Sequence, residues 1–353
     1  MERVRINASR AYDVVIGLGV LDTVGDELSH LVKSRTVAIV ADDVTYPLFG
    51  ARTKASLESA GFYTCEYIIP HGEESKSAEN YIRILEFLAE RGLSRTDCLV
   101  ALGGGVVGDL SGFVAASFLR GIPFVQIPTT LLAAVDSSVG GKCAINLQAG
   151  KNLAGAFYQP SVVLCDTEII GSLPDDIFSE GMAEVIKYGA IRSEKVFGLI
   201  EDGARENLGE LISECVRIKR DVVCEDEFDT GLRQLLNFGH TPAHAIERLS
   251  DFKISHGAAV AAGMCIMSRA AEKLGLCEAG ISDEIEKLCK KFSLPTTAQF
   301  SAKDMFAVAM RDKKRALGKI TLVIPRTRGE SVLYTVSEEE TEKFFALGLS
   351  EGE

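Results

Sequence analysis

Short apolar runs alternate with amphipathic stretches through the first 170 residues, and this alternation constrains the fold more than any other feature. The runs are TVAIVADD (residues 36–43), CEYIIP, DCLVALGG, PFVQIPTT and SVVLCD. Strands that are apolar along their whole length are buried on both faces, which is typical of a parallel sheet. The stretches near residues 47–59 and 77–91, and the one that ends at Phe118, have helical character. We therefore predict a Rossmann-like α/β domain with a mostly parallel sheet and helices on both faces.

From about Leu173 the pattern becomes almost entirely helical. Six successive stretches carry helical periodicity, and only GKITLVIP and ESVLYTV, which flank a turn with Gly329, predict a late hairpin. We expect an α/β domain at residues 1–172 and a mainly helical domain at 173–353. Ligands of α/β sheets bind at the carboxyl ends of the strands, so we expect the site in a cleft between the two domains.

Composition excludes several classes of protein. The chain has 353 residues, which is long enough for two cores. Its formal net charge of -12 argues against broad nucleic-acid binding, and an anionic substrate would need a local basic pocket. The start of the chain has no signal-peptide apolar segment, and the run GAAVAAGMCIM is too short to cross a bilayer. Nine cysteines without a CxxC pair do not form a disulfide framework, so we expect a cytoplasmic protein.

Three of the five histidines, His240, His244 and His256, fall in one short window. A single histidine more often caps a helix or fills a core, but three together favour a site. Two histidines with one carboxylate and an open position are typical of catalytic zinc. The spacing alone leaves the carboxylate open among three candidates: Glu184, Glu247 and Asp229.

The residues around these histidines predict two helix starts. Pro242 favours a first helical position, so Thr241 would be the N-cap and His240 would lie just outside the helix. Ser255 is a suitable N-cap for a helix that begins at His256. The dipole at a helix N-terminus disfavours the protonated ring, which suits a neutral metal ligand.

A glycine-rich turn predicts a phosphate-binding site. Gly103, Gly105 and Gly108 match GxGxxG after a strand and at the start of a helix, where the backbone can approach a pyrophosphate. The match is imperfect, since this is not the first strand and no acidic residue follows at the usual distance. Asp42, at an earlier strand end, could bind ribose hydroxyls instead. The alternative is a tight turn that packs helix on strand.

Cations gather in the same part of the sequence. VGGKCA resembles a P-loop only faintly, because GxxxxGK fails and Cys143 replaces the magnesium-binding Ser or Thr, so we exclude ATP hydrolysis. Lys142 lies close in sequence to Asp136, and Lys151 and Asn152 follow. Together with five further cations there are enough for one phosphate and one carboxylate: Arg120, Lys187, Arg233, Lys313 and Lys314.

Seven segments in order resemble the 3-dehydroquinate synthase family of sugar phosphate cyclases. They are GGGVVGDLSGFVAASFLRG, IPTTLLAAVDSSVGGKCAIN, GKNLAGAFYQP, GMAEVIKYG, GLRQLLNFGHTPAHAIE, SHGAAVAAGM and RDKK. They span nearly the whole chain, so the match is more specific than any one motif. By fold the resemblance extends to glycerol-dehydrogenase-like alcohol dehydrogenases.

The resemblance implies a role for each matching residue. Zinc or cobalt would be bound by Glu184, His240 and His256, and His244 would be an acid/base beside it. The other catalytic residues would be Lys142, Arg120 and Asp136. Substrate contacts would come from Lys151, Asn152, Lys187, Arg233, Asn237, Asp229 and one or both of Lys313 and Lys314. NAD would contact Asp42, Gly72, Glu73, Lys76, Gly103, Gly104, Gly105, Gly108, Asp109, Thr129, Thr130, Lys142 and Lys151.

The implied reaction converts 3-deoxy-D-arabino-heptulosonate 7-phosphate (DAHP) to 3-dehydroquinate and phosphate, the second step of the shikimate pathway to chorismate and the aromatic amino acids. It proceeds by transient oxidation with NAD, elimination of phosphate, reduction and an intramolecular aldol closure. The resemblance also suggests a homodimer. Asp229, where the family usually has glutamate, and Pro242 depart from its pattern. The alternatives are another sugar phosphate cyclase, a metal-dependent polyol dehydrogenase and a non-catalytic nucleotide- or metal-binding module.

Overall fold

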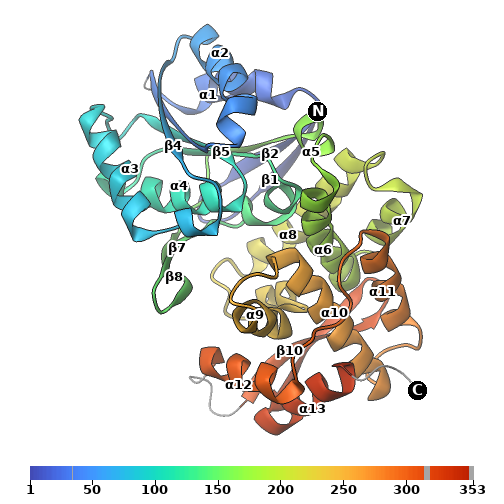
Figure 1. Ribbon diagram of the computed structural model, residues 1–353. Coiled ribbons are helices and arrows are strands. Elements are labelled where there is room, and N and C mark those ends of the chain that lie inside the picture. Colours follow the sequence, from blue (N-terminus) through green and yellow to red (C-terminus); the bar gives the residue numbers. More distant parts are fainter. Residues whose placement is uncertain (34, 314–318, 350–353) are drawn as a thin grey trace. The chain divides into compact units, whose positions relative to one another are not determined.

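The chain divides into two compact units in the computed structural model, which describes residues 1–33, 35–313 and 319–349. Side chains are described except at 311–313. Unit 1 consists of Met1–Leu173 with Leu208–Phe228, and unit 2 of Pro174–Asn207 with Asp229–Glu353. The elements are labelled in Figure 1.

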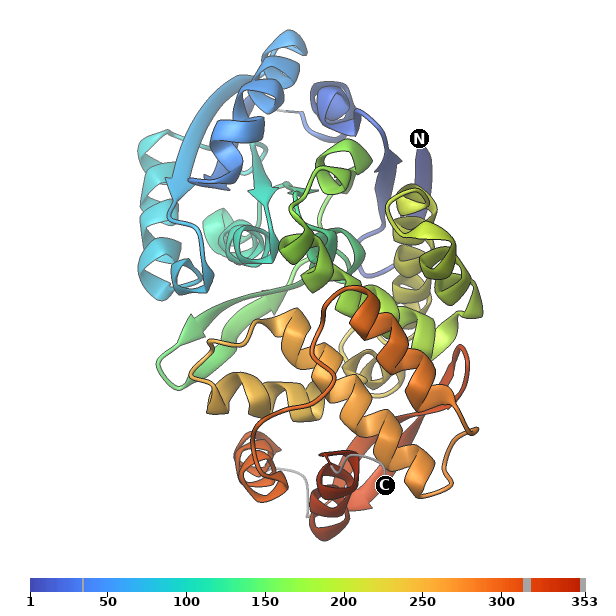
Figure 2. The same ribbon diagram turned by 45° about the vertical axis from the view of Figure 1, so that its right-hand side comes forward.

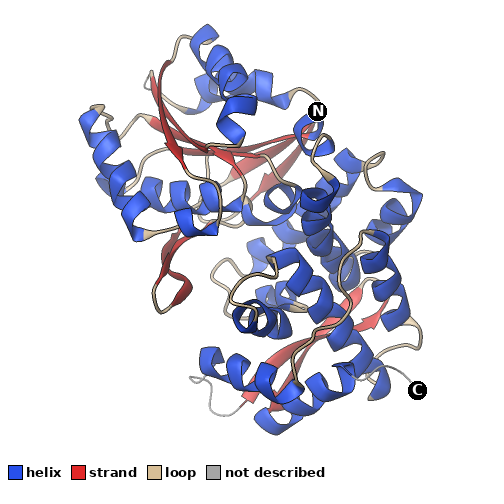
Figure 3. Cartoon of the chain, in the orientation of Figure 1, coloured by secondary structure: helices blue, strands red, loops and turns tan. Residues whose placement is uncertain are grey.

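Unit 1 is built on a seven-stranded sheet of order β1-β2-β9-β6-β5-β3-β4, in which only β1 runs antiparallel to its neighbour (Figure 3). The strands are β1 (Glu2–Ile6), β2 (Tyr12–Gly17), β3 (Thr36–Asp42), β4 (Tyr63–Ile69), β5 (Cys98–Gly103), β6 (Phe124–Pro128) and β9 (Val162–Asp166). The mostly parallel sheet confirms the predicted fold class. The β1–β2 pair was not predicted.

Helices cover both faces of this sheet (Figure 1). They are α1 (Val24–Leu31), α2 (Ala51–Ser59), α3 (Ala78–Glu90), α4 (Gly105–Ser117), α5 (Thr167–Gly171) and α8 (Leu208–Glu225), with short turns η1 (Val20–Thr23), η2 (Tyr46–Gly50), η3 (Glu73–Ser75), η4 (Phe118–Arg120) and η5 (Ala133–Ser137). Alternate residues of β3 enter two separate cores: Val37 and Ile39 pack with α1 and α2, and Ala38 and Val40 with α3 and α4. Burial on both faces explains why this strand is continuously apolar.

A second hairpin of unit 1, β7 (Lys142–Leu147) with β8 (Gly150–Phe157), was also not predicted. β8 is only half-buried and contains glycine, lysine and asparagine, so its sequence, GKNLAGAF, lacks the apolar alternation of a strand. Pairing with β7 rather than local propensity makes it a strand.

The position of α8 differs from the expected division at residues 172/173. That boundary places residues 208–228 in the helical part, whereas the structure groups them with unit 1. α8 packs against β1, β2 and η5. Its periodicity predicts an apolar face but carries no information about which element that face covers.

Unit 2 is mainly helical, with one two-stranded sheet. Its elements are α6 (Asp175–Arg192), α7 (Glu194–Gly203), η6 (Leu232–Asn237), α9 (His240–Leu249), α10 (His256–Lys273), α11 (Ile281–Lys291), α12 (Ala302–Lys313), β10 (Lys319–Thr327), β11 (Glu330–Ser337) and α13 (Glu338–Leu349). The antiparallel pair β10–β11 confirms the predicted late hairpin, with Gly329 at φ 80° in its turn.

Helix α10 is the centre of unit 2 (Figure 2). It packs against α6, α9, α11 and α13 and is buried along most of its length. Its small residues, in GAAVAAGMC, allow the backbones of neighbouring helices to come close. Among the described residues, no helix is both long and apolar enough to span a membrane.

Candidate active site

Three side chains of unit 2 form a cluster with metal-ligand geometry. Glu184 comes from the middle of α6, and His240 and His256 are the first residues of α9 and α10. One ligand atom from each lies within 4.8 Å of the others, the one group of this kind in the described part of the chain. Glu184 Oε1 is 3.3 Å from His256 Nε2 and 3.6 Å from His240 Nε2. Two donors, each about 2.0–2.1 Å from a tetrahedral zinc ion, lie about 3.3–3.4 Å apart, so the set fits such an ion.

Glycine brings the two histidine-bearing helices together. Gly239 has φ 76°, and a Cβ atom there would lie 2.8 Å from the Met264 backbone nitrogen and 2.9 Å from the Val260 carbonyl oxygen. α9 therefore starts directly against the backbone of α10. The left-handed Gly239 begins the helix at His240, so the prediction of Thr241 as N-cap was wrong. The structure confirms the position of Ser255, as the residue before α10.

Each histidine ring has its Nδ1 atom directed at an acceptor. His240 Nδ1 is 3.1 Å from the Phe238 carbonyl oxygen, and His256 Nδ1 is 3.7 Å from Glu247 Oε2. When the proton of a neutral ring is on Nδ1, the lone pair of Nε2 is available to bind a metal. Both Nε2 atoms face Glu184. Glu247 thus lies behind His256, and neither Glu247 nor Asp229 belongs to the ligand cluster.

The two histidines titrate in opposite directions. Burial lowers the pKa of His240 to about 3; the attraction of Glu184 opposes this shift, and the positive charges of Lys187 and the other histidines add to it. Burial also lowers the pKa of His256, but the carboxylates of Glu184 and Glu247 more than offset this effect and raise the pKa to about 10. In the metal-free protein at neutral pH, His240 is neutral and His256 carries a proton.

The other oxygen of Glu184 pairs with Lys187. The two side chains are three residues apart on α6, and both are fully buried. A buried ion pair of this kind is costly to break by removal of one partner, because the other charge stays buried. Lys187, predicted as a substrate contact, therefore lies directly beside the ligand cluster.

The remaining predicted residues of unit 2 surround the start of α9. His244 is exposed, one turn after His240, with ring centroids 5.7 Å apart, and it is not part of the cluster. Arg233 is buried in η6, and Asn237 is exposed at the end of the same turn. Lys314 lies outside the described residues. Lys313 ends α12, but its side chain also lies outside the described part.

In unit 1, several of the predicted dinucleotide residues lie at or next to the carboxyl ends of β3, β5 and β6. β4 and β5 lie on opposite sides of β3, so the order in which strands are added to the sheet reverses between β3 and β5, although both strands run in the same direction. Ligands of open α/β sheets bind at such a switch point. Gly103 ends β5, Gly104 precedes α4, and the Thr129 amide donates to the Gly103 carbonyl at 3.0 Å. The strand–turn–helix context predicted for the glycine motif is therefore confirmed.

A buried ion pair lies next to this turn. Lys76 Nζ bonds Asp109 in α4, and burial raises the pKa of the Asp109 carboxyl despite the lysine. Asn146 of β7 donates to Glu73 Oε1 at 2.7 Å and accepts from the Asn152 amide at 2.9 Å. The structure thus links the turn at residues 72–76 to α4 and to the β7–β8 hairpin.

Asp42 has a structural role that the sequence did not reveal. Its Oδ1 atom accepts from the amides of Val44 at 3.0 Å and Thr45 at 2.7 Å. Thr45 in turn donates to the Leu102 carbonyl of β5 at 3.1 Å. The carboxylate therefore shapes the turn after β3 at the switch point.

The β7–β8 hairpin places Lys142 and Lys151 near its opposite ends, although the sequence analysis grouped them among the cations of one region. Lys142 pairs with Phe157 at one end, whereas Lys151 and Asn152 lie near the turn, where Leu147 pairs with Gly150. Five residues of strand span about 16 Å, so the backbones at Lys142 and Lys151 lie far apart along the hairpin. The hairpin thus presents two separate cationic positions.

Asp136, at η5, pairs with a lysine that sequence reasoning missed. Lys219 of α8 donates to Asp136 Oδ1 at 2.7 Å and to its carbonyl oxygen at 2.6 Å, and Lys219 is 5% exposed. The sequence does contain a sign of this ion pair, because Lys219 lies on the same face of α8 as the buried Cys215 and Val222. A lysine on the apolar face of a helix requires a buried partner.

Three predicted site residues have left-handed backbone conformations. Arg120 has φ 67°, Asn152 has φ 57° and Asp229 has φ 61°. Only seven non-glycine residues of the described chain have positive φ. Asparagine and aspartate adopt this conformation readily, so of the three only Arg120 carries backbone strain, which the surrounding structure must maintain.

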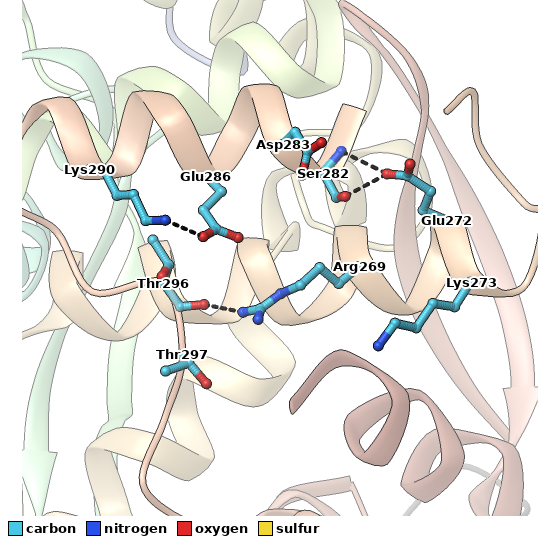
Figure 4. Close-up of a pocket in the computed structure, with 9 residues that line it drawn as sticks. All are labelled: Arg269, Glu272, Lys273, Ser282, Asp283, Glu286, Lys290, Thr296 and Thr297. Atoms are coloured by element: carbon cyan, nitrogen blue, oxygen red, sulfur yellow. Dashed lines mark hydrogen bonds and ion pairs between the residues drawn. The ribbon is translucent and has the colours of Figure 1, made fainter. Parts of the chain in front are cut away.

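A pocket of unit 2 lies apart from all these residues. Figure 4 shows it between α10 and α11, lined by Arg269, Glu272, Lys273, Ser282, Asp283, Glu286, Lys290, Thr296 and Thr297. Arg269 donates to the carbonyls of Cys265 and Thr296, Glu272 binds the start of α11, and Lys290 pairs with Glu286. Its charges are balanced and used within the fold, and none of the predicted site residues lines it.

Solved structures place this fold among the sugar phosphate cyclases. A 2-deoxy-scyllo-inosose synthase solved with carbaglucose-6-phosphate, NAD+ and Co2+ superposes with a TM-score of 0.88 at 24% identity, over 99% of this chain and 100% of that chain. A 2-epi-5-epi-valiolone synthase from Streptomyces hygroscopicus, with NAD+ and Zn2+ bound, gives 0.86 at 25% identity, over 98% and 99%. An NADH-dependent butanol dehydrogenase from Thermotoga maritima gives 0.68 at 14% identity, over 96% of each chain.

Sequence comparison identifies the family within this class. Models of the 3-dehydroquinate synthase N-terminal and C-terminal domains match residues 66–180 and 181–315. The chain is 43% identical to the 3-dehydroquinate synthase of Clostridium perfringens, over 96% of this chain and 99% of that protein. It is 42% identical to that of Streptococcus suis, over 95% and 97%. The chain belongs to the 3-dehydroquinate synthase family, and the comparisons favour that activity over the alternatives.

Proposed function

We propose that the protein converts DAHP to 3-dehydroquinate and phosphate, with a divalent metal and NAD as cofactors. The observation that carries the proposal is the cluster of Glu184, His240 and His256 with Lys187 beside it, in a chain 43% identical to a curated 3-dehydroquinate synthase. A simple dehydrogenase has no need of the cations that a phosphorylated keto acid requires.

The metal ligands in this proposal are Glu184 Oε1 and the Nε2 atoms of His240 and His256. Three protein ligands leave a fourth tetrahedral position for substrate. When bound, the metal polarises a substrate hydroxyl and NAD accepts and later returns a hydride, chemistry that no side chain of the protein supplies.

His244 is the proposed acid/base. Its exposed ring, one turn after the ligand His240, exchanges protons with substrate and with solvent. Lys187, Arg233, Asn237 and Asp229 hold the substrate in unit 2, together with Lys313 or Lys314. Arg233 is a buried cation in a chain of net charge -12, and Lys187 is a second buried cation, whose charge is paired with Glu184.

Unit 1 supplies the proposed NAD site at the switch point of its sheet. The start of α4 offers backbone amides and the positive end of its dipole to the pyrophosphate. The residues proposed to contact NAD are Asp42, Gly72, Glu73, Lys76, Gly103, Gly104, Gly105, Gly108, Asp109, Thr129, Thr130, Lys142 and Lys151. Arg120, Asp136 and Lys142 are proposed as catalytic residues, and Lys151 and Asn152 as substrate contacts.

We also propose that the protein acts as a cytoplasmic homodimer. All nine cysteines are free thiols, which fits a reducing compartment. The dimer is supported by the family resemblance, and sedimentation or light scattering of the purified protein tests it.

The decisive experiment supplies the purified protein with DAHP, a catalytic amount of NAD and zinc. We expect phosphate and 3-dehydroquinate in equal amounts and no net NADH. Net NADH from a simple polyol would favour a dehydrogenase, and turnover of another sugar phosphate without DAHP activity would favour a sister cyclase. Inertness that metal and NAD do not relieve would indicate a non-catalytic module.

A further inference from the structure

One carboxylate binds the chain neighbours on both sides of His256. Glu180 of α6 accepts a hydrogen bond from Ser255 Oγ through Oε1 and one from the Gly257 amide through Oε2, at 2.9 Å. Ser255 and Gly257 are the chain neighbours of His256. The carboxylate therefore fixes the residue before α10 and satisfies an amide of its first turn.

The backbones of α6 and α10 are also in contact at this point. A Cβ atom at Gly257 would lie 2.3 Å from the Glu180 carbonyl oxygen, so only glycine allows this approach. Glu180 lies one helical turn before Glu184 on the same face of α6. One helix thus supplies both the carboxylate that faces His256 Nε2 and the carboxylate that holds the His256 backbone.

The location of His256 makes this contact important. His256 is the first residue of its helix, and helix ends fray unless their amides are satisfied. A metal ligand must be held within a few tenths of an ångström of its required position. Groups that orient a ligand typically contribute 10–100-fold to metal affinity.

We propose that Glu180 is a positioning residue for metal binding, which holds His256 in place by clamping the start of α10 onto α6. The proposal rests on the metal site of the proposed function. Glu180 is not itself a ligand, because its two oxygens are used by Ser255 and Gly257.

The test compares Glu180→Ala with Glu180→Gln in the full chain, freed of metal. Zinc affinity is measured by competition with a chromophoric chelator, which requires neither NAD nor substrate. We expect Glu180→Ala to bind zinc about tenfold more weakly or worse. A glutamine amide can still accept from the Gly257 amide and donate to Ser255 Oγ, so Glu180→Gln should stay within about threefold of the unaltered protein.

The same unit offers a matched control. Glu272 makes an equivalent clamp at the start of α11, where its carboxylate accepts from Ser282 Oγ and from the Ser282 amide at 3.1 Å (Figure 4). It also accepts from the Gly280 amide at 2.8 Å. No candidate ligand lies in α11. Glu272→Ala should lower thermal stability as Glu180→Ala does, but leave zinc affinity unchanged.

Three results would overturn the proposal: zinc affinity of Glu180→Ala equal to that of the unaltered protein, an equal loss in Glu180→Gln and Glu180→Ala, or an equal loss in Glu272→Ala. The second would show that charge acts rather than position. Should Glu180→Ala not fold, Ser255→Ala removes one of the two bonds, and unchanged affinity there would count against the clamp. Absence of zinc binding in the unaltered protein would refute the metal site itself.

Discussion

At the scale of single residues, the two carboxylate oxygens of Glu184 have different partners. Oε1 faces the Nε2 atoms of His240 and His256, and Oε2 pairs with Lys187. All of this occurs without exposure of Glu184 to solvent. A charge so deeply buried is tolerated only because positive partners surround it, which ties the stability of this region to its proposed chemistry.

Replacement of Glu184 should therefore show how much a buried lysine without its carboxylate lowers the free energy of unfolding. We expect Glu184→Leu to lower the free energy of unfolding of the metal-free protein by about 3–5 kcal/mol, since Lys187 loses its buried carboxylate. The double variant Glu184→Leu/Lys187→Met should recover much of this loss. Urea unfolding measures both, and a double variant no more stable than the single one would contradict the ion-pair argument.

Metal binding should release about one proton between pH 7 and 9. The pKa of His256 is raised to about 10, so its ring is protonated in the metal-free protein and must lose the proton to bind metal. The pKa of His240 is lowered to about 3, so this ring is already neutral. Zinc affinity should accordingly rise with pH up to about 10. Calorimetry in buffers of different ionisation enthalpy counts the protons, and a value near zero or two would be inconsistent with these pKa shifts.

At the scale of elements, helix ends create both candidate sites. The metal cluster takes two ligands from the first residues of α9 and α10, and the proposed NAD site uses the start of α4. In each case a glycine permits the approach, of helix to helix in unit 2 and of cofactor to backbone in unit 1. Substitution of the glycine should therefore weaken metal binding in unit 2 and NAD binding in unit 1.

Gly239→Ala should impair metal binding as well as stability. Its Cβ atom would lie 2.8 Å from the Met264 amide nitrogen, so the start of α9 must move away from α10 and take His240 with it. Gly275→Ala is the matched control, because Gly275 also has positive φ but no atom within 4 Å of the added Cβ. Both should lose about 1 kcal/mol of stability from backbone strain, whereas only Gly239→Ala should lose zinc affinity in a chelator competition.

Gly104→Asp should separate NAD binding from stability. An aspartate at the N-cap of α4 stabilises the helix but places negative charge where the pyrophosphate would lie. Gly104→Asn has the same shape without the charge, and both variants meet the Thr130 methyl at 3.2 Å. Calorimetric titration should show NAD binding at least about tenfold weaker in the Asp variant than in the Asn variant. Equal affinities would argue against this location.

At the scale of the whole molecule, neither unit is one continuous segment. The chain leaves unit 1 after Leu173, returns at Leu208 for α8 and leaves again after Phe228. The returning helix carries Lys219, the buried partner of Asp136, and packs against β1 and β2. Unit 1 is therefore incomplete without a helix that follows part of unit 2 in sequence.

A fragment of residues 1–173 should consequently fold poorly. Removal of α8 exposes the apolar surface of β1 and β2 and leaves Asp136 without Lys219. A chimera that joins residue 173 to residues 208–228 by a short linker should unfold cooperatively, because Gly171 lies beside the Leu208 side chain. A chimera with a scrambled α8 sequence is the control. Equal cooperativity of the bare fragment and the chimera in thermal unfolding would contradict the role assigned to α8.

Local sequence pattern and family motifs were enough to predict much of the fold and of the candidate site. Continuous apolar runs predicted the buried parallel strands because burial on both faces requires them, although the run CEYIIP forms the half-exposed edge strand β4. The late hairpin was predicted from the two short runs that flank the turn with Gly329. The glycine motif was correctly placed between strand and helix. The resemblance, rather than spacing, selected Glu184 for the candidate metal cluster, which the structure brings together.

Tertiary structure alone decided what depends on contacts between distant segments. Strand β8 lacks a local signal and forms through pairing with β7, and α8 joins unit 1 because its apolar face meets β1 and β2. The start of α9 at His240 depends on the left-handed Gly239 packed on α10. The partners of Glu180, Lys219 and Asp42 likewise appear only in the fold. Periodicity shows which face of an element is apolar, but the choice of partner for that face is made by packing.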